Sequence, residues 1–537
     1  MNKRKYSGNM QRMPGYIDSC HKAVMNKLIR ITKENINKIS SGTIYLLSFS
    51  DNYVNDMIDE FGRNVVESIN CYIDFSHKGT DKDINGKIIN CIDIDNVTLL
   101  SQDADYIIVD DYYWEIYEKY VQKLVIDKDI YFFANRETSY DLDYRQRYEN
   151  VPLKNIILFR SGPHASAYIK GTDFSDNARA VFEYMLSVGL NEKYELVWLV
   201  KNPDEFKHIE DNYPGVRFLS FDWSVSDVPQ NRDAYYEALC LSKYIFFTDA
   251  YGFCRNARKD QIRIQLWHGC GFKTRVNFVR CEDRYEYMPV ISPVYAEIHK
   301  KIYGLRDDQI LITGYPKEDT IFHPRNDWKE LLGIKEARKY IFWLPTFRKT
   351  DVNNLAEVDM YQLSGETGLP IAKNINDLSK LDECLRAQDM FLVLKLHPFQ
   401  DRSLINIPDC SNIVFIDNES LVNNDIQINE ILGFADALIS DYSSVAVDYL
   451  LLDRPIAFLI DDIQEYENKR GFVFEPIREW LPGVEIKTFS ELYDFIVEIS
   501  KDIDSSMEKR RSISKQMHSF KDDQSCKRLI EALGIVV

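Results

Sequence analysis

The sequence predicts an α/β protein made of several Rossmann-like domains with parallel sheets, and three observations support this fold class. The chain has 537 residues, enough for roughly two to four domains of ordinary size. Hydrophobic residues make up 45% and charged residues 28%, the composition of a globular protein with several cores. Short Ile- and Val-rich runs alternate with amphipathic helical patterns along the chain, which is typical of parallel βαβ units.

The first segment, residues 1–42, is predicted to be helical and basic. Residues 1–38 contain nine Lys or Arg against two acidic residues. Between these lysines, apolar side chains recur at helical spacing, at Ile17, Cys20, Val24, Leu28, Ile31 and Ile39. Such a helix either lies on an anionic membrane surface or packs on the next domain with its lysines in solvent. The apolar stripe lacks enrichment in Trp, Phe and Leu, which favours packing on the next domain.

Residues 43–150 are predicted to form an accessory, acidic Rossmann-like domain. A strand from Thr43 is followed by a helical pattern and by three strand-like runs at 68–74, 86–93 and 104–111. The region holds 22 acidic and 10 basic residues and has no G-x-G-x-x-G turn, which disfavours a dinucleotide or another anionic ligand. Three Asp-x-Asp pairs resemble metal-holding spacing, although most such pairs are solvated loop residues: Asp93/Asp95, Asp103/Asp105 and Asp141/Asp143.

Two further α/β series complete the chain, one over residues 151–325 and the other over residues 326–537. The strand-like runs of the first series lie at 155–162, 194–200, 216–221, 243–250 and 262–269. Those of the second lie at 340–347, 391–398, 412–417, 437–444 and 454–460. Two successive α/β domains imply a cleft between them, and ligands of open parallel sheets bind beyond the carboxyl ends of the strands.

Charge and cysteine usage exclude several classes of protein. The formal net charge is −18, which argues against a nucleic-acid partner. The ten cysteines are scattered without a C-x-x-C pair, which is typical of reduced thiols in a cytosol. The first thirty residues lack the apolar core of a signal peptide, and no run approaches the roughly 20 apolar residues of a membrane span. We therefore expect a cytoplasmic protein.

His268 is the first candidate catalytic residue. It follows the strand-like run that ends at Trp267, and Gly269 permits close approach of the backbone to a ligand. The ordinary imidazole pKa of about 6.5 makes histidine a usable base near neutral pH. A histidine packed at a turn is the alternative interpretation.

Further candidates follow strands of the last α/β series. Lys395 and His397 close one strand, and Pro398 directs His397 into an extended turn. Thr346 and Arg348 close another, where the planar Arg fork suits phosphate oxygens and a surface ion pair is the alternative.

The run Asp441-Tyr442-Ser443-Ser444 ends a strand and opens a helix. The free N–H groups at such a helix start favour a phosphate, whereas simple helix capping would also explain the serines.

At these residues the sequence resembles the CDP-glycerol glycerophosphotransferase family, which contains the teichoic-acid primases and polymerases of Gram-positive walls and related capsule enzymes. The matching pieces cover about residues 155–480 in order. The first are Gln265-Leu266-Trp267-His268-Gly269 with Lys273, Ser292-Pro293, Thr313-Gly314-Tyr315-Pro316 and Pro345-Thr346-Phe347-Arg348. The others are Leu396-His397-Pro398, Asp441-Tyr442-Ser443-Ser444 with Asp448, Leu452-Asp453-Arg454-Pro455, Glu465-Tyr466 and Arg470-Gly471-Phe472.

The resemblance implies a GT-B fold, with residues 151–325 as the N-terminal acceptor domain and residues 326–537 as the C-terminal donor domain. It implies transfer of a polyol phosphate from CDP-glycerol or another CDP-polyol to a hydroxyl of a lipid-linked or polymeric acceptor, with release of CMP. Neither a cofactor nor a metal is implied. Such an enzyme works in the cytoplasm, with peripheral contact at the inner face of the membrane as a further expectation.

The resemblance also assigns roles to residues. His268 and His397 would be catalytic, with His268 as the base. The donor phosphates would be held by Thr346, Arg348, Lys395, Asp441, Ser443, Ser444 and Asp448. The acceptor side or cleft would be formed by Gly269, Lys273, Tyr315 and Glu465.

Two departures from the family pattern leave the polyol open. Family members commonly carry Thr-Pro after the His-Gly pair, where this chain has Cys270 and Gly271. After Gly-Tyr-Pro they often carry Arg or Asn with Asp, where this chain has Lys317, Glu318 and Asp319. The alternatives are a GT-B glycosyltransferase that uses a nucleotide sugar, and a non-catalytic protein that binds polymer or acts as a scaffold.

Overall fold

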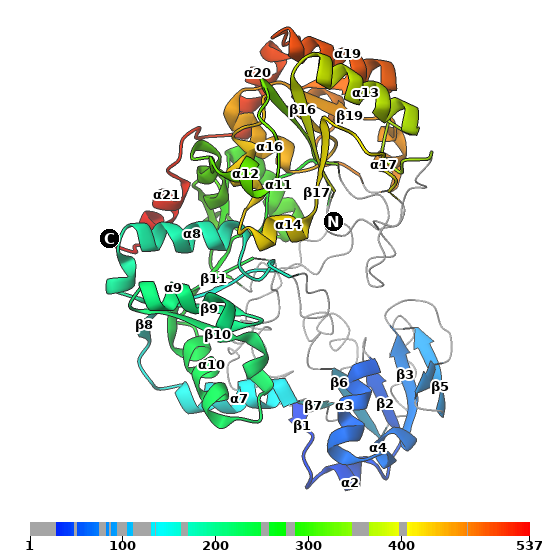
Figure 1. The fold of residues 1–537 in the computed structure, drawn as a ribbon. Helices are drawn as coiled ribbons and strands as arrows, with labels where there is room; N and C mark the ends of the chain where they lie inside the picture. Colours follow the sequence, from blue (N-terminus) through cyan, green and yellow to red (C-terminus); the bar gives the residue numbers. More distant parts are fainter. Residues whose placement is uncertain are drawn as a thin grey trace.

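Three sheets, dominated by parallel strands, organise the chain in a computed structural model (Figure 1). The structure describes residues 28–47, 51–74, 82–84, 87–93, 105–110, 130–134, 136–162, 170–248, 257–274, 285–345, 365–396, 405–469 and 471–536. The predicted α/β class with parallel sheets is confirmed.

The first sheet has seven strands in the order β1-β7-β6-β2-β3-β5-β4, and only the β4–β5 pair is antiparallel. Its strands are β1 (Leu28–Arg30), β2 (Ile44–Leu47), β3 (Ile69–Asp74), β4 (Lys82–Ile84), β5 (Lys87–Asp93), β6 (Tyr106–Asp110) and β7 (Ile130–Phe133). Its helices are α2 (Ile36–Ile39), α3 (Asp51–Phe61) and α4 (Asn64–Glu67). Val54 and Met57 of α3 are buried against the sheet.

The second sheet has five parallel strands in the order β10-β9-β8-β11-β12. The strands are β8 (Lys154–Arg160), β9 (Glu195–Val200), β10 (Val216–Ser220), β11 (Ser242–Phe247) and β12 (Ile262–Gln265). The helices are α7 (Arg136–Tyr148), α8 (Asp176–Ser187), α9 (Lys207–Asn212) and α10 (Pro229–Leu241). Alternate residues of β8 face opposite layers: Ile157 packs with Phe182 of α8, and Leu158 packs with Leu239 of α10. We call this sheet with its helices the first α/β unit.

The third sheet has six parallel strands in the order β17-β16-β15-β18-β19-β20. The strands are β15 (Lys339–Trp343), β16 (Met390–Lys395), β17 (Ile413–Ile416), β18 (Ala437–Ser440), β19 (Ile456–Leu459) and β20 (Val484–Ile486). The helices that follow β15 are α13 (Ile375–Ala387), α14 (Asn418–Asn423), α15 (Ile428–Leu432), α16 (Val445–Tyr449), α17 (Ile463–Lys469), α18 (Ile477–Trp480), α19 (Phe489–Ser500) and α20 (Met507–Met517). Helices α13 and α19 cover one face, and α16 and α20 cover the other. We call this sheet with its helices the second α/β unit.

Several elements join the two units. A two-stranded sheet, β13 (Met288–Val290) and β14 (Ile310–Ile312), continues from β12, and α12 (Trp328–Leu331) precedes β15. Helix α11 (Pro293–Tyr303) places Tyr295 in the core of the second unit and Tyr303 in that of the first. The last helix, α21 (Ser525–Ala532), lies beside α8 and adds Leu529 to the first unit's core (Figure 1). The chain therefore crosses between the units more than once, which fixes the strand ends of one unit relative to those of the other.

Two details of the amino-terminal region differ from the sequence-based expectation. The prediction of a helix through Leu28 and Ile31 is wrong for Leu28–Arg30, because these residues form β1 and pair with β7. The rest of the predicted basic helix, residues 1–27, lies outside the described part of the chain. Asp141 and Asp143 form ion pairs with Arg145 (2.9 Å) and Arg30 (3.7 Å). No group of three or more His, Cys, Asp or Glu within the described ranges is arranged to hold a metal ion.

Candidate active site between the two α/β units

The loop that follows β12 carries His268 in an unusual backbone conformation. Trp267 has φ = +55° and Gly269 has φ = +150°. A bulky residue at positive φ costs about 1–3 kcal/mol and persists only where its surroundings hold it. The Trp267 ring is buried and stacks on the His268 ring, with 4.2 Å between their centroids, whereas His268 itself is exposed.

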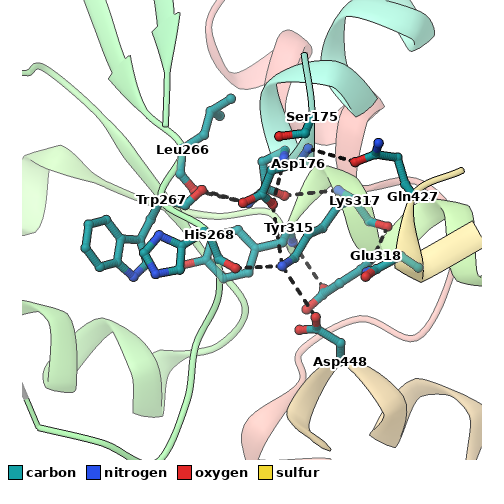
Figure 2. Close-up of polar contacts among 12 residues, drawn as sticks. Ser175, Asp176, Leu266, Trp267, His268, Tyr315, Lys317, Glu318, Gln427 and Asp448 are labelled. Carbon is teal, nitrogen blue, oxygen red and sulfur yellow. Dashed lines mark hydrogen bonds and ion pairs between the residues drawn. The ribbon is translucent and has the colours of Figure 1, made fainter. Parts of the chain in front are cut away.

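Side chains from two other segments hold this loop by its main-chain carbonyls (Figure 2). The Asn177 side-chain amide, on α8, donates to the carbonyls of Trp267 (3.0 Å) and Leu266 (3.4 Å). Lys317 lies on the short 3₁₀ helix η8 (Pro316–Phe322), and its Nζ donates to the His268 carbonyl at 2.6 Å. Three consecutive carbonyls are therefore held by side chains, which accounts for the persistence of the strained backbone.

Lys317 also lies between two carboxylates. Its Nζ is 3.5 Å from Oδ1 of Asp176, the first residue of α8, and 3.5 Å from Oδ2 of Asp448 on α16 (Figure 2). Burial acts to lower the pKa of Lys317, but the two carboxylates outweigh burial and raise the pKa above its ordinary value. Burial raises the pKa of Asp448, and Lys317 opposes that rise. The ammonium is therefore charged and joins the two units electrostatically.

The second unit contributes a half-buried cation at the end of β16. Lys395 is the last residue of that strand, and burial lowers its pKa to about 8, with Asp417 opposing the effect. Its Nζ lies 3.5 Å from the Leu396 carbonyl. A desolvated ammonium attracts an anionic ligand more strongly than an exposed one does.

The turn after β18 touches the histidine loop directly. Asp441 is fully buried, and Ser443 and Ser444 are half-buried. A Cβ placed on Gly269 would lie 2.9 Å from Ser444 Oγ, so the loop and the turn approach so closely that only glycine fits. The alternative of simple helix capping does not account for Ser444, because Ser444 occupies the N-cap position of α16 without a side-chain capping bond. Helix α16 is five residues long.

A second inter-unit contact lies beyond the histidine loop. Lys273 and Phe472 form an isolated antiparallel β-bridge between their main chains. The Val473 N–H donates to the Phe272 carbonyl at 2.8 Å. Glu465 is exposed on α17. Lys273 therefore lies where the two units meet.

A cavity of about 350 Å³ lies between the two units. Its walls come from α8 and the segment before it, from α14 and α15, and from Lys395, Lys317 and His268. Arg179 of α8 closes one side through a two-bond ion pair with Asp425 (2.6 and 3.0 Å). The cavity therefore opens beyond the carboxyl ends of strands from both sheets, the position expected for a ligand of parallel α/β domains.

The structure brings together only part of the predicted set. His268 and Lys395 line the cavity, and Gly269 meets Ser444 beside it. Tyr315 does not line the cavity, since its side chain is fully buried and its hydroxyl lies 3.5 Å from Cys270 Sγ. Thr346, Arg348 and His397 lie outside the described residues. Asp448 is ion-paired with Lys317, an arrangement unsuited to direct contact with a phosphate.

Sequence reasoning missed the residues that hold the loop and line the cavity from α8. Asp176, Asn177 and Arg179 follow the predicted strand at 155–162 by 14 to 17 residues, so a search for polar residues directly after each strand did not reach them. In the sequence, Lys317 was noted only as a departure from the family pattern.

The helices in the described part of the chain are all too short or too polar to cross a bilayer.

Comparison with known proteins gives a consistent result. The family model of the CDP-glycerol:poly(glycerophosphate) glycerophosphotransferases matches residues 144–534. The teichoic acid glycerol-phosphate transferase of Staphylococcus aureus is 24% identical over 71% of this chain and 94% of its own length. The ribitol-phosphate polymerase TarL of the same organism is 26% identical over 71% of this chain and 62% of its own length. A variant of the wall teichoic acid polymerase TagF, soaked with CDPG, has a similar fold, with a TM-score of 0.54 and 21% identity over 74% of this chain and 92% of that one.

Proposed function

Because the chain belongs to the CDP-glycerol:poly(glycerophosphate) glycerophosphotransferase family, we propose that it transfers a polyol phosphate from a CDP-polyol to a hydroxyl of a teichoic-acid-like polymer. The observation that carries this proposal is the cavity between the two units, which His268 lines on one side and the half-buried Lys395 on the other. We also propose a GT-B arrangement, in which the first unit receives the acceptor and the second unit receives the donor.

In the proposed reaction, the His268 imidazole accepts the proton of the acceptor hydroxyl. The acceptor oxygen attacks the phosphorus that bears the polyol and forms a phosphodiester. The bond from that phosphorus to the bridging oxygen breaks, and CMP leaves with the electron pair. The imidazolium then releases its proton to solvent, so atoms and charge balance.

Lys395 stabilises the negative charge that moves onto the CMP phosphate, because it lines the cavity as a desolvated cation. Ser443 and Ser444, which follow β18 beside the histidine loop, are proposed to donate hydrogen bonds to the diphosphate. Thr346, Arg348 and His397 complete the proposed donor site on sequence grounds. Because side chains supply this positive charge, we propose that the reaction uses no metal or other cofactor.

Mass spectrometry of the products tests the function. Purified protein is incubated with CDP-glycerol, CDP-ribitol or nucleotide sugars, together with teichoic-acid acceptors, with and without EDTA. We expect CMP release and growth of the acceptor by one polyol-phosphate mass per turn, unchanged by EDTA. Turnover with nucleotide sugars alone would instead support a glycosyltransferase, and turnover with none of the donors would contradict an enzymatic role.

We further propose peripheral contact with an anionic membrane face, supported by the nine Lys or Arg within residues 1–38. Cosedimentation with vesicles that contain acidic lipids is expected to fall when residues 1–27, which precede β1, are deleted. Equal cosedimentation of the full chain and the deletion variant would contradict the membrane contact.

A further inference from the structure

Lys317 contacts three segments that meet at the cavity: the histidine loop, α8 of the first unit and α16 of the second. We infer that Lys317 is a positioning residue that sets the place of His268 relative to the Ser443–Ser444 turn. The inference rests on the proposed function, in which His268 is the base and the turn binds the donor.

On the side of the histidine loop, Lys317 makes two connections. Its Nζ donates to the His268 carbonyl at 2.6 Å, so the ammonium contacts the residue whose side chain is to accept the proton. Its own main-chain N–H donates to Asn177 Oδ1 at 3.0 Å. The Asn177 amide in turn holds the carbonyls of Leu266 and Trp267. Side chain and main chain of Lys317 therefore both fix the backbone that presents the imidazole.

On the side of the second unit, the contact leads directly to the serine turn. Asp448 Oδ2 is 3.5 Å from the ammonium, and the Asp448 main-chain N–H donates to the Ser444 carbonyl at 3.1 Å. Asn429 of α15 adds a contact to the Lys317 carbonyl at 3.4 Å. A displacement of Lys317 would therefore move both the His268 loop and the Ser443–Ser444 turn.

The ammonium of Lys317 is engaged by groups of the protein itself. It carries three N–H groups, and three acceptors surround it: the His268 carbonyl, Asp176 and Asp448 (Figure 2). Glu318 is buried nearby, and burial raises its pKa well above the ordinary value. Lys317 consequently acts through His268 and the turn, without touching the reacting atoms.

Kinetics of two variants test the role. Lys317→Met keeps the length of the side chain and removes its charge, and Lys317→Arg keeps the charge. We expect Lys317→Met to lower kcat at least 100-fold while the Kd for CDP-glycerol, measured by calorimetry, changes less than threefold. Lys317→Arg is expected to recover kcat to within about tenfold of the wild type.

A control variant separates this effect from the loss of any lysine that pairs with two carboxylates. Lys300 on α11 also pairs with two carboxylates, Glu297 at 2.6 Å and Asp307, but these pairs are exposed and Lys300 does not line the cavity. Lys300→Met is expected to leave kcat within twofold. If Lys317→Met also keeps kcat within threefold, the positioning role is refuted.

A double variant and a spectroscopic measurement exclude a merely structural role. Lys317→Met leaves the buried Asp448 without its cation and lowers the melting temperature, and Lys317→Met with Asp448→Asn is expected to restore the melting temperature but not kcat. Recovery of kcat together with stability would overturn the inference. In protein labelled at the histidine Cε1 positions, the His268 resonance, assigned by its loss in His268→Ala, should shift in Lys317→Met and not in Lys300→Met. This last comparison needs no turnover, so an inactive wild type would refute the proposed function while the resonance still decides the role of Lys317.

Discussion

The two α/β units present different kinds of group to the cavity between them. The first unit offers an exposed imidazole, His268, on a strained loop that is held through its carbonyls by Asn177 and Lys317. The second unit offers a half-buried and partly desolvated ammonium, Lys395, at the end of a strand. A proton acceptor must exchange its proton with water after each turnover, whereas a fixed charge gains strength from being desolvated. The position of the base therefore depends on the main-chain contacts that hold its loop. The strength of the cation's interaction with an anion depends on its partial removal from water.

The largest effect should come from removing the exposed group of the first unit. His268→Ala is expected to lower kcat by about 10³-fold or more, because it deletes the base, while the Kd for CDP-glycerol stays within threefold. CMP release measures kcat and calorimetry measures Kd. His323→Ala removes an exposed histidine that pairs with Asp523 away from the cavity, and it should leave both unchanged. Activity of His268→Ala within tenfold of the wild type would require a different base.

The next effect should come from the backbone that carries the base. Gly269→Ala adds a Cβ 2.9 Å from Ser444 Oγ at φ = +150°, so the loop must move away from the serine turn, and kcat should fall about 10²-fold. Gly189→Ala also places a side chain at positive φ, but nothing lies within 4 Å of its Cβ. It should cost stability only. Equal kcat in the two variants would mean that the contact of the loop with the turn is unimportant.

The sequence allowed the strand ends to be predicted, and with them His268 and Lys395, because both follow short apolar runs with strong β character. The residues that hold the loop were not predictable in this way. Asn177 and Lys317 act on carbonyls 90 and 49 residues away in the chain, and such contacts depend on how segments meet in three dimensions. The edge strand β1 was missed for a related reason: its three residues fit a helical pattern locally, and pairing with β7 decides their conformation.

The half-buried cation of the second unit, Lys395, should govern donor affinity and its pH dependence. Lys395→Met is expected to weaken CDP-glycerol binding about tenfold at pH 7, because a charge-assisted contact to the diphosphate is lost. The pKa of Lys395 is about 8, so in the wild type the ammonium is mostly protonated at pH 7 and mostly neutral at pH 9. Wild-type affinity should therefore fall above pH 8 towards that of Lys395→Met, by about tenfold in all, and the Lys395→Met profile should be flat there.

Calorimetry between pH 6.5 and 9.5 measures this difference. Lys201→Met removes a surface lysine that pairs with Asp222 and should retain the wild-type profile. The melting temperature of Lys395→Met, measured alongside, shows whether the variant is folded and so whether unfolding contributes to the loss of affinity. A wild-type affinity that does not vary from pH 7 to pH 9 would show that Lys395 does not face the donor.

The smallest effect should come from the serine turn, and it separates two roles for Ser444. If the hydroxyl donates to the donor diphosphate, Ser444→Ala raises the Kd for CDP-glycerol about threefold to tenfold with little change in kcat, as expected for one lost hydrogen bond. If the Ser444 side chain only packs against Gly269 and fixes the position of the histidine loop, the Kd stays constant and kcat falls. We expect the first result, because the turn follows β18 at the same sheet edge as Lys395. Ser187→Ala, on the exposed end of α8, provides the matched control and should change neither constant.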